Sequence, residues 1–227
     1  MPSPRFAIPL ALALTACAAQ LTPVAVEPAL IVEASAPTSE GGIPTDWRNV
    51  ATPADRDRVE RVGDAWAPAL AQARAKGFAD EIEVEGPLLD PAGALLRPAP
   101  SPGSYRCRMI KLGGTIGFRA FPPYFCYVEA EGALLILDKQ TGSERPGGRV
   151  WDDDDQQLVF LGALELGDED TPPAYGARPE RDMAGVVQRV APFRWRLVLP
   201  ATRPGSSLDV LELVPAPQAP PRQASTR

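Results

Sequence analysis

The chain has 227 residues, of which 44% are hydrophobic and 23% are charged, so it is long enough for one ordinary globular domain with extra segments at its ends. Its formal net charge of −6 argues against binding to phosphate backbones, which requires a positive face. The sequence contains no histidine, which excludes histidine-based catalytic triads, histidine-ligated zinc and acid–base catalysis by histidine.

The amino-terminal residues have the pattern of an export signal. Arg5 precedes an apolar run at 6–14, which is too short to span a membrane and is typical of a signal peptide at 1–16. The motif Leu14-Thr15-Ala16-Cys17 resembles the lipobox of bacterial lipoproteins, which implies that Cys17 is lipidated and begins the mature chain. Ordinary cleavage near 16–18 is the alternative, and it leaves Cys17 as an unpaired thiol in an oxidising compartment.

Lipidation predicts a place in the cell envelope, with the lipid as the contact to the membrane. Ala18 stands where inner-membrane lipoproteins commonly carry aspartate, so resemblance to that class favours an outer-membrane lipoprotein that faces the periplasm. Segment 17–44 is rich in proline and alanine and is predicted to be a tether. Segment 215–227 is rich in proline, has no apolar face and is predicted to be a disordered tail.

The remaining residues, 45–214, are predicted to form one domain that begins with a helix. Thr52-Pro53-Ala54-Asp55 has the features of a helix start, namely a threonine cap, a proline at the first position and an acid three residues after the cap. Helical spacing continues to Lys76-Gly77 and predicts one helix kinked at Pro68, with an apolar stripe made of Val59, Val62, Trp66, Leu70 and Ala73. A second, weaker helix or turn is predicted within 78–89.

From Ser104 onward, short β-type runs alternate with turn residues. The predicted strands lie at 105–112, 124–130, 134–139, 145–151, 157–166, 185–190, 194–199 and 208–214. Eight strands with mostly short connections favour a mainly β fold with an N-terminal helix: an eight-stranded antiparallel up-and-down barrel, lipocalin-like. A strongly curved or open sheet is the alternative. Runs 134–137 and 158–161 are apolar on both faces, so we expect the helix to pack on the outer wall of the barrel.

Cys107 and Cys126 each lie on a predicted strand. Glycines and prolines between them allow the chain to fold back, so we predict a disulfide at the opening of the barrel, which requires an oxidising compartment. Two buried reduced thiols are the alternative. A redox or metal role is disfavoured because the sequence has no C-x-x-C motif and no histidine to complete a site.

The sequence contains no catalytic constellation. It lacks G-x-S-x-G and S-x-x-K motifs, so no catalytic residue is assigned and no cofactor is expected. The acidic runs 152–155 and 168–170 lack the spacing of a calcium loop and are interpreted as turns, so no metal site is expected. The densest group of basic residues on the predicted strands consists of Arg106, Arg108, Lys111, Lys139 and Arg145. It is interpreted as ordinary surface charge, and the more specific alternative is an anion-binding site at the barrel opening.

An ordered series of short motifs also resembles a known family. The segments are 46–48, 51–56, 88–91, 105–108, 110–113, 141–146, 160–162, 182–186 and 195–200, from Asp46-Trp47-Arg48 at the start to Trp195-Arg196-Leu197-Val198-Leu199-Pro200 at the end. Taken in order, they resemble the domain of unknown function family 4893 of exported alphaproteobacterial proteins. The resemblance covers roughly 46–215 and implies an envelope protein, with no activity and no functional residues to carry over.

Together these features predict an envelope lipoprotein whose barrel is a non-enzymatic binding or structural module, with a protein partner or small ligand and no nucleic acid. A lipocalin-like carrier is a variant of this module, and it needs an unfilled interior. If Trp195, Phe160, Leu164 and Leu197 fill the interior, no ligand fits. One alternative is an inhibitor of a protease or lysozyme-type hydrolase, by analogy with small lipid-anchored barrels. Another is a carboxylate-dependent enzyme, which needs two acids in an apolar cleft.

Mass spectrometry of the unreduced mature protein tests both cysteine assignments. We expect an amino-terminal peptide that starts at Cys17 and carries the mass of its acyl chains, together with a linked pair of peptides that hold Cys107 and Cys126. An unmodified Cys17 contradicts lipidation, and free thiols at the other two positions contradict the disulfide.

Overall fold

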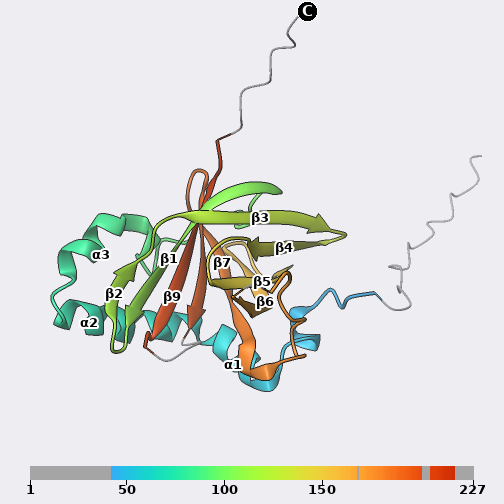
Figure 1. Cartoon of the computed structure of the whole chain (residues 1–227), viewed down its shortest axis with the longest axis horizontal. Coiled ribbons are helices and arrows are strands. Elements are labelled where there is room, and N and C mark those ends of the chain that lie inside the picture. Colours follow the sequence, from blue (N-terminus) through green and yellow to red (C-terminus); the bar gives the residue numbers. More distant parts are fainter. Residues whose placement is uncertain (1–41, 168, 201–204, 218–227) are drawn as a thin grey trace, which may run out of the picture. The chain divides into compact units, whose positions relative to one another are not determined.

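Nine antiparallel strands form one sheet that closes on itself (Figure 1). The computed structural model describes residues 42–167, 169–200 and 205–217, so the predicted signal peptide, Cys17, most of the tether and 218–227 of the tail lie outside the described residues. The strands are β1 (Gly103–Gly113), β2 (Gly117–Ala120), β3 (Tyr124–Glu131), β4 (Leu134–Lys139), β5 (Glu144–Asp152), β6 (Gln157–Leu166), β7 (Asp182–Ala191), β8 (Arg194–Pro200) and β9 (Leu208–Pro215). Because β1 pairs with β9, all strands except β2 make the wall of an eight-stranded barrel, which confirms the predicted fold.

All eight predicted strands are present, and β2 is an additional one that the sequence pattern does not predict. It has four residues and lies between a glycine-rich turn and Pro122-Pro123, which is the pattern of a loop. It forms a strand because it pairs with the last four residues of β1. The tight turn between them requires glycine at 114, where φ is +58° and a Cβ atom would lie 2.5 Å from the carbonyl oxygen of Gly205.

Strand β1 changes partner along one of its edges. Its first part, 103–107, pairs with β3, whereas 110–113 pairs with β2. The disulfide between Cys107 and Cys126 lies where β1 and β3 part, with a Cα–Cα distance of 5.8 Å and both side chains buried inside the barrel. The predicted disulfide is therefore confirmed.

Inward-facing side chains fill the middle of the barrel. This inner cluster consists of Tyr105, Cys107, Cys126, Val128, Leu137, Val150, Leu158, Phe160, Leu164, Met183, Val187, Trp195, Leu197, Leu199, Leu211 and Leu213. All four residues that were expected to plug the lumen belong to it. Within the described barrel, the interior is thus not open along its length, and the carrier variant lacks the deep cavity that it needs.

The helical segments precede the barrel and lie along one side of it (Figure 1). They are η1 (Trp47–Asn49), α1 (Pro53–Glu60), η2 (Val62–Ala65), α2 (Trp66–Ala75), α3 (Ala79–Glu85) and η3 (Gly86–Leu88), and a further 3-10 turn, η4 (Pro179–Arg181), precedes β7. Thr52 caps α1 as predicted, since its Oγ1 accepts a hydrogen bond from the Asp55 amide at 3.1 Å. Among the described residues, no helix combines the length and apolar character needed to cross a membrane.

The prediction of one helix kinked at Pro68 is wrong. The helix is instead interrupted at Arg61, where α1 ends and the 3-10 segment η2 follows. Pro68 lies in the first turn of α2, where backbone N–H groups have no partner within the helix. A proline there removes no helical hydrogen bond, so it does not disturb the helix.

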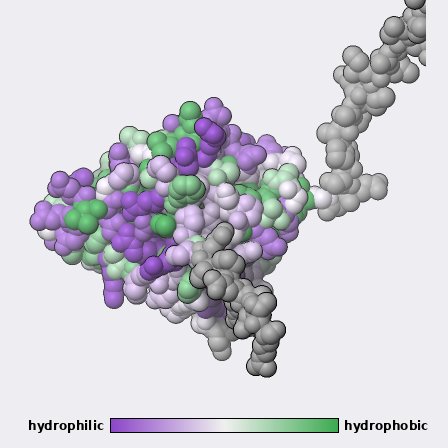
Figure 2. Space-filling model, turned by 90° about the horizontal axis from the view of Figure 1, so that it is seen from above, coloured by the Kyte–Doolittle hydropathy of each residue, from purple (hydrophilic) through white to green (hydrophobic). Residues whose placement is uncertain are grey.

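The helix layer covers part of the outer wall, as expected. Val59, Val62, Trp66 and Leu70 are buried together with outward-facing apolar residues of β1, β6, β7, β8 and β9. Strand β6 is apolar on both faces because Val159 and Leu161 join this outer cluster while Leu158 and Phe160 point inward. The face of the molecule seen in Figure 2 is mainly hydrophilic, with hydrophobic residues in separate spots.

Arg196 on β8 joins the helix layer to the barrel. Its side chain is fully buried and lies 4.6 Å from the centre of the Trp66 ring. Its Nη1 donates hydrogen bonds to the carbonyl oxygens of Leu88 at 3.0 Å and Asp90 at 2.7 Å, just where the helical segment ends. Burial lowers the pKa of Arg196 to about 10, so the guanidinium is charged at neutral pH and depends on these acceptors.

Replacing Arg196 tests this connection. Arg196→Met keeps most of the side-chain volume but removes the buried donor to the Leu88 carbonyl and one of the two donors to the Asp90 carbonyl, which keeps its bond from the Gly93 amide, so we expect a loss of about 2 kcal/mol in the free energy of unfolding. Urea denaturation measures the loss, and amide exchange should accelerate first in 86–90. The control Arg106→Gln, at an exposed position of β1, should change stability by less than about 0.5 kcal/mol. Equal stability of the two variants would refute the role given to Arg196.

Candidate functional site

One end of the barrel holds a cavity of about 300 Å³ that is partly open to solvent. It lies at the end where β1 finishes and β9 begins, next to the filled interior. The lining residues are Met109, Lys111, Ile116, Arg119, Phe121, Tyr124, Lys139, Ser143, Glu144, Pro146, Leu164, Met183 and Asp209. We call this space the mouth cavity.

The mouth cavity opens where the wall of the barrel is interrupted. Strands β2 and β3 lie in succession along the same edge of β1, but Phe121-Pro122-Pro123 separates them. The amide of Phe121 still donates to the Met109 carbonyl at 2.9 Å, whereas the two prolines have no N–H to continue the ladder. The wall therefore parts here, and the disulfide holds β1 to β3 immediately below the gap.

The floor of the mouth cavity is apolar and its walls are charged. Met109, Leu164 and Met183 belong to or pack against the inner cluster, so the cavity rests on the filled core. Three cationic and two carboxylate side chains line the walls, which leaves one positive charge in excess although the whole chain is negative. An apolar floor below a few charged groups is the usual composition of a small-ligand site.

Lys111 lies between the two carboxylates of the mouth cavity. Its Nζ is 3.3 Å from Oε2 of Glu144 and 3.5 Å from Oδ2 of Asp209. The Ser206 hydroxyl also donates to Asp209, at 2.6 Å. Burial raises the pKa of Asp209, while the hydrogen bond from Ser206 and the charge of Lys111 act in the opposite direction. Asp209 is thus engaged by protein groups on two sides.

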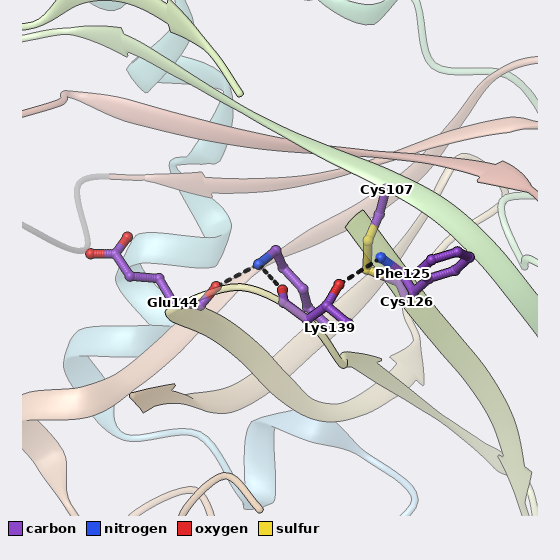
Figure 3. The surroundings of a disulfide bond; sticks show 6 residues. Cys107, Phe125, Cys126, Lys139 and Glu144 are labelled. Atoms are coloured by element: carbon purple, nitrogen blue, oxygen red, sulfur yellow. Dashed lines mark hydrogen bonds between the residues drawn. A yellow bond between two sulfur atoms is a disulfide. The ribbon is translucent and has the colours of Figure 1, made fainter. Parts of the chain in front are cut away.

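Lys139 lies opposite Cys126 in the β3–β4 pairing, and its side chain extends toward Glu144 (Figure 3). Its Nζ donates to the carbonyl oxygens of Thr141 at 2.5 Å and Glu144 at 2.9 Å, and lies 4.2 Å from the centre of the Tyr124 ring. Burial lowers the pKa of Lys139 to about 8, and the nearby positive charge of Arg145 contributes. The lysine therefore closes the β4–β5 turn and places a proton-exchanging group on the cavity wall.

Arg119 of β2 provides the third cation, at the rim. It is directly opposite Lys111 in the β1–β2 register, and its guanidinium carbon lies 5.0 Å from the centre of the Phe121 ring. Within the described part of the chain, no carboxylate lies within salt-bridge distance of Arg119. Its charge is therefore available to an incoming anion.

The family model described as Domain of unknown function (DUF4893) matches residues 47–213. The chain belongs to this family. No curated protein and no solved structure matches the chain. The match begins in η1 and ends in β9, so the helix layer and the barrel together make up the DUF4893 domain, and the resemblance found in the sequence is confirmed.

The DUF4893 domain brings together two of the five basic residues that the sequence singled out. Lys111 and Lys139 line the mouth cavity. Arg106 is exposed, and Arg108 lies on the outer wall, where Nη2 is 2.6 Å from Glu85 and Nε is 2.8 Å from Glu212. Arg145 donates to Glu165 at 2.8 Å from Nε and to nearby carbonyl groups. Whether any of the five binds an anion stays a prediction.

The acidic runs of the DUF4893 domain serve local structure where they are described. Asp153 accepts hydrogen bonds from Trp47 Nε1 at 2.9 Å and from Arg48, and Asp154 accepts from the amides of the turn that follows it. Glu169 pairs with Arg181, while Asp168 lies outside the described residues. Among the described residues, no group of three or more acidic or cysteine side chains is arranged to hold a metal ion.

The titration of Lys139 gives a direct test of the cavity wall. The pKa of Lys139 is about 8 in the fold and 10.5 ordinarily, so the unfolded chain binds more protons between these values and the stability contributed by this residue rises with pH across that window. With ¹³C-labelled lysine, three Cε signals are expected, and the one lost in Lys139→Met should titrate near pH 8.

A second variant checks the cause of the shift. Glu144→Gln removes a negative charge that raises the pKa of Lys139, so the midpoint should move to lower pH. A Lys139 midpoint at the ordinary value would contradict the buried position described for its ammonium group.

Proposed function

We propose that this protein is an envelope-anchored binding module that takes up a small anionic ligand with an apolar body at the mouth of its barrel. The proposal rests on the mouth cavity, which is a partly open space of about 300 Å³ with an apolar floor and an excess of positive charge. The volume is at the lower end of the range for small-molecule sites. It suits a compact ligand better than a long lipid.

The charges around the mouth cavity indicate how such a ligand would lie. Arg119 at the rim has no carboxylate within salt-bridge distance among the described residues, whereas Lys111 is held by Glu144 and Asp209. A carboxylate or similar anion would therefore meet Arg119 first, with Lys139 deeper on the wall. Its apolar body would then cover Met109, Leu164 and Met183, from which water would be released.

The geometry favours binding over a carboxylate-dependent reaction. Two acids do converge in the mouth cavity, as such a reaction requires. Asp209 is, however, already held by Ser206 and Lys111, and both acids share the same lysine. The arrangement resembles a structural ion-pair network that shapes the cavity wall more than an acid and a base set apart by their surroundings.

The location in the envelope is supported by the disulfide and by the export pattern of the sequence. A buried disulfide between Cys107 and Cys126 needs an oxidising compartment in which to form. The lipobox-like motif at Cys17 lies outside the described residues and carries the proposed anchor to the outer membrane. A lipidated module of this kind would present its barrel to the periplasm.

A series of straight-chain carboxylates of increasing length tests the proposed function. Titration calorimetry with acetate, butyrate, hexanoate, octanoate and decanoate should show affinity rising by roughly fourfold per methylene, from about 0.8 kcal/mol for each buried CH₂, until the cavity is full. Arg119→Gln should weaken binding by roughly tenfold, because it removes a charge-assisted hydrogen bond. Alcohols of the same lengths should bind more weakly than the acids.

The matched control is Arg106→Gln, which removes an exposed arginine from the outer face of the neighbouring strand β1. It should leave the affinities unchanged. Binding that does not depend on chain length, or that responds equally to both arginine substitutions, would show that the mouth cavity is not the site.

A further inference from the structure

The opposite end of the barrel carries a second hollow, an open groove of about 850 Å³. It lies where β1 begins and β9 ends, at the top of Figure 1. The side chains that matter for its chemistry are Arg97, Tyr105, Tyr127, Arg189, Phe193 and Trp195. We call it the aromatic groove, and the filled interior of the barrel separates it from the mouth cavity.

Backbone strain is concentrated in the aromatic groove. Among the described residues, two that are not glycine have a positive φ, Arg97 at 60° and Phe193 at 58°, and both line this groove. Such a backbone is costly for residues with a large side chain, and strain of this kind gathers at functional sites.

Phe193 is unfavourable at its position for a second reason. It occupies the turn between β7 and β8 and is 73% exposed, so its side chain does not pack in the core, and its residue type is not one that favours the backbone conformation of the turn. Glycine or asparagine would suit the backbone better and would expose no apolar ring to water. An aromatic side chain held out in this way has the character of an anchor for a partner.

The floor of the aromatic groove is rigid and aromatic. The rings of Tyr105 and Trp195 meet edge to face with their centres 5.9 Å apart, and the Tyr105 hydroxyl donates to the Ser101 carbonyl at 2.6 Å. Trp195 is buried, and its Nε1 has no hydrogen-bond partner within the described residues. A buried donor without a partner is uncommon in a folded protein.

The charges of the aromatic groove are of one sign. Arg97 and Arg189 line it, no lining residue is a carboxylate, and neither arginine has a carboxylate within 4.0 Å in the described chain. Arg189 is oriented by the Leu96 carbonyl, to which its Nε donates at 3.1 Å. Arg97 also lines a neighbouring hollow, which contains the acidic residues 152–155, so Arg189 is the arginine that faces the aromatic groove alone. An occupant with a single acidic group beside an apolar one complements this pattern.

We propose that the aromatic groove docks an extended peptide segment of a partner protein, in which an aromatic or large aliphatic side chain stands next to an aspartate or glutamate. The apolar side chain packs against Phe193 and Tyr127, and the acid pairs with Arg189 or Arg97. The larger volume of the groove and the protruding Phe193 suit a peptide better than a small molecule, which the smaller mouth cavity suits. This second site is independent of the function proposed for the mouth cavity.

A library of random ten-residue peptides, displayed on phage and selected on the full chain, provides the probe. We expect enrichment of sequences with a large apolar residue within two positions of an acid. A synthetic peptide from the selection, followed by fluorescence anisotropy, should bind Phe193→Asn at least tenfold more weakly. The thermal midpoint of that variant should be unchanged or higher, because asparagine accepts a positive φ.

Two further variants complete the test. Phe125→Ala removes another exposed ring, which lies outside the groove, and should leave binding unchanged. Arg189→Gln should weaken binding of the selected peptide but not of its analogue with glutamine in place of the acid. Selection of peptides without acids, or full binding by Phe193→Asn, would overturn the proposal. Self-association of the chain through this groove, with no peptide selected, would also overturn it.

Discussion

The shape of the barrel depends on the pairing of β1, a strand of eleven residues that has three partners. One edge pairs with β9 over 105–112 and closes the wall. The other edge is divided between β3 and β2, and the prolines that separate these two strands leave the ladder incomplete. Closure and opening thus arise on opposite edges of the same strand, and the disulfide fixes the point where the second edge divides.

The strands of the barrel wall contribute side chains to two apolar clusters, one inside the barrel and one beneath the helices. This explains why β6 is buried along nearly its whole length and does not alternate between buried and exposed residues. Apolar contacts are not directional, so a wall that is apolar on both faces does not by itself fix the orientation of the helices on it. Arg196 helps to fix this orientation, because its buried guanidinium needs hydrogen-bond acceptors in particular directions, and the carbonyl groups of Leu88 and Asp90 provide them.

Local signals account for what the sequence predicts correctly. Strand alternation, turn residues and the threonine cap all act within a few neighbours, so eight strands and the start of α1 can be predicted. The break between α1 and α2 contains one glycine, Gly63, which by itself does not end a helix, and β2 is too short to show a period, so both depend on tertiary packing.

The candidate site was predictable only in part. Alternation along β1 places Cys107 and Lys111 on the inner face and Arg106 and Arg108 on the other, which would have separated the basic residues into two groups. Arg119 could not be assigned, because its inward position depends on the pairing of β2 with β1. The position of Phe193 in the turn and its positive φ could not be predicted, because an apolar residue next to an alternating strand has the pattern of that strand.

The disulfide lies within the filled interior, where the two cysteines are 0% and 1% exposed. Exchange with a cellular thiol requires direct approach of a thiolate to one of the sulfur atoms. While the barrel stays closed, a thiolate has no access to either sulfur atom, so the fold protects the bond from reductants. The mouth wall beside it is consequently a permanent part of the folded protein and does not respond to later changes in redox conditions.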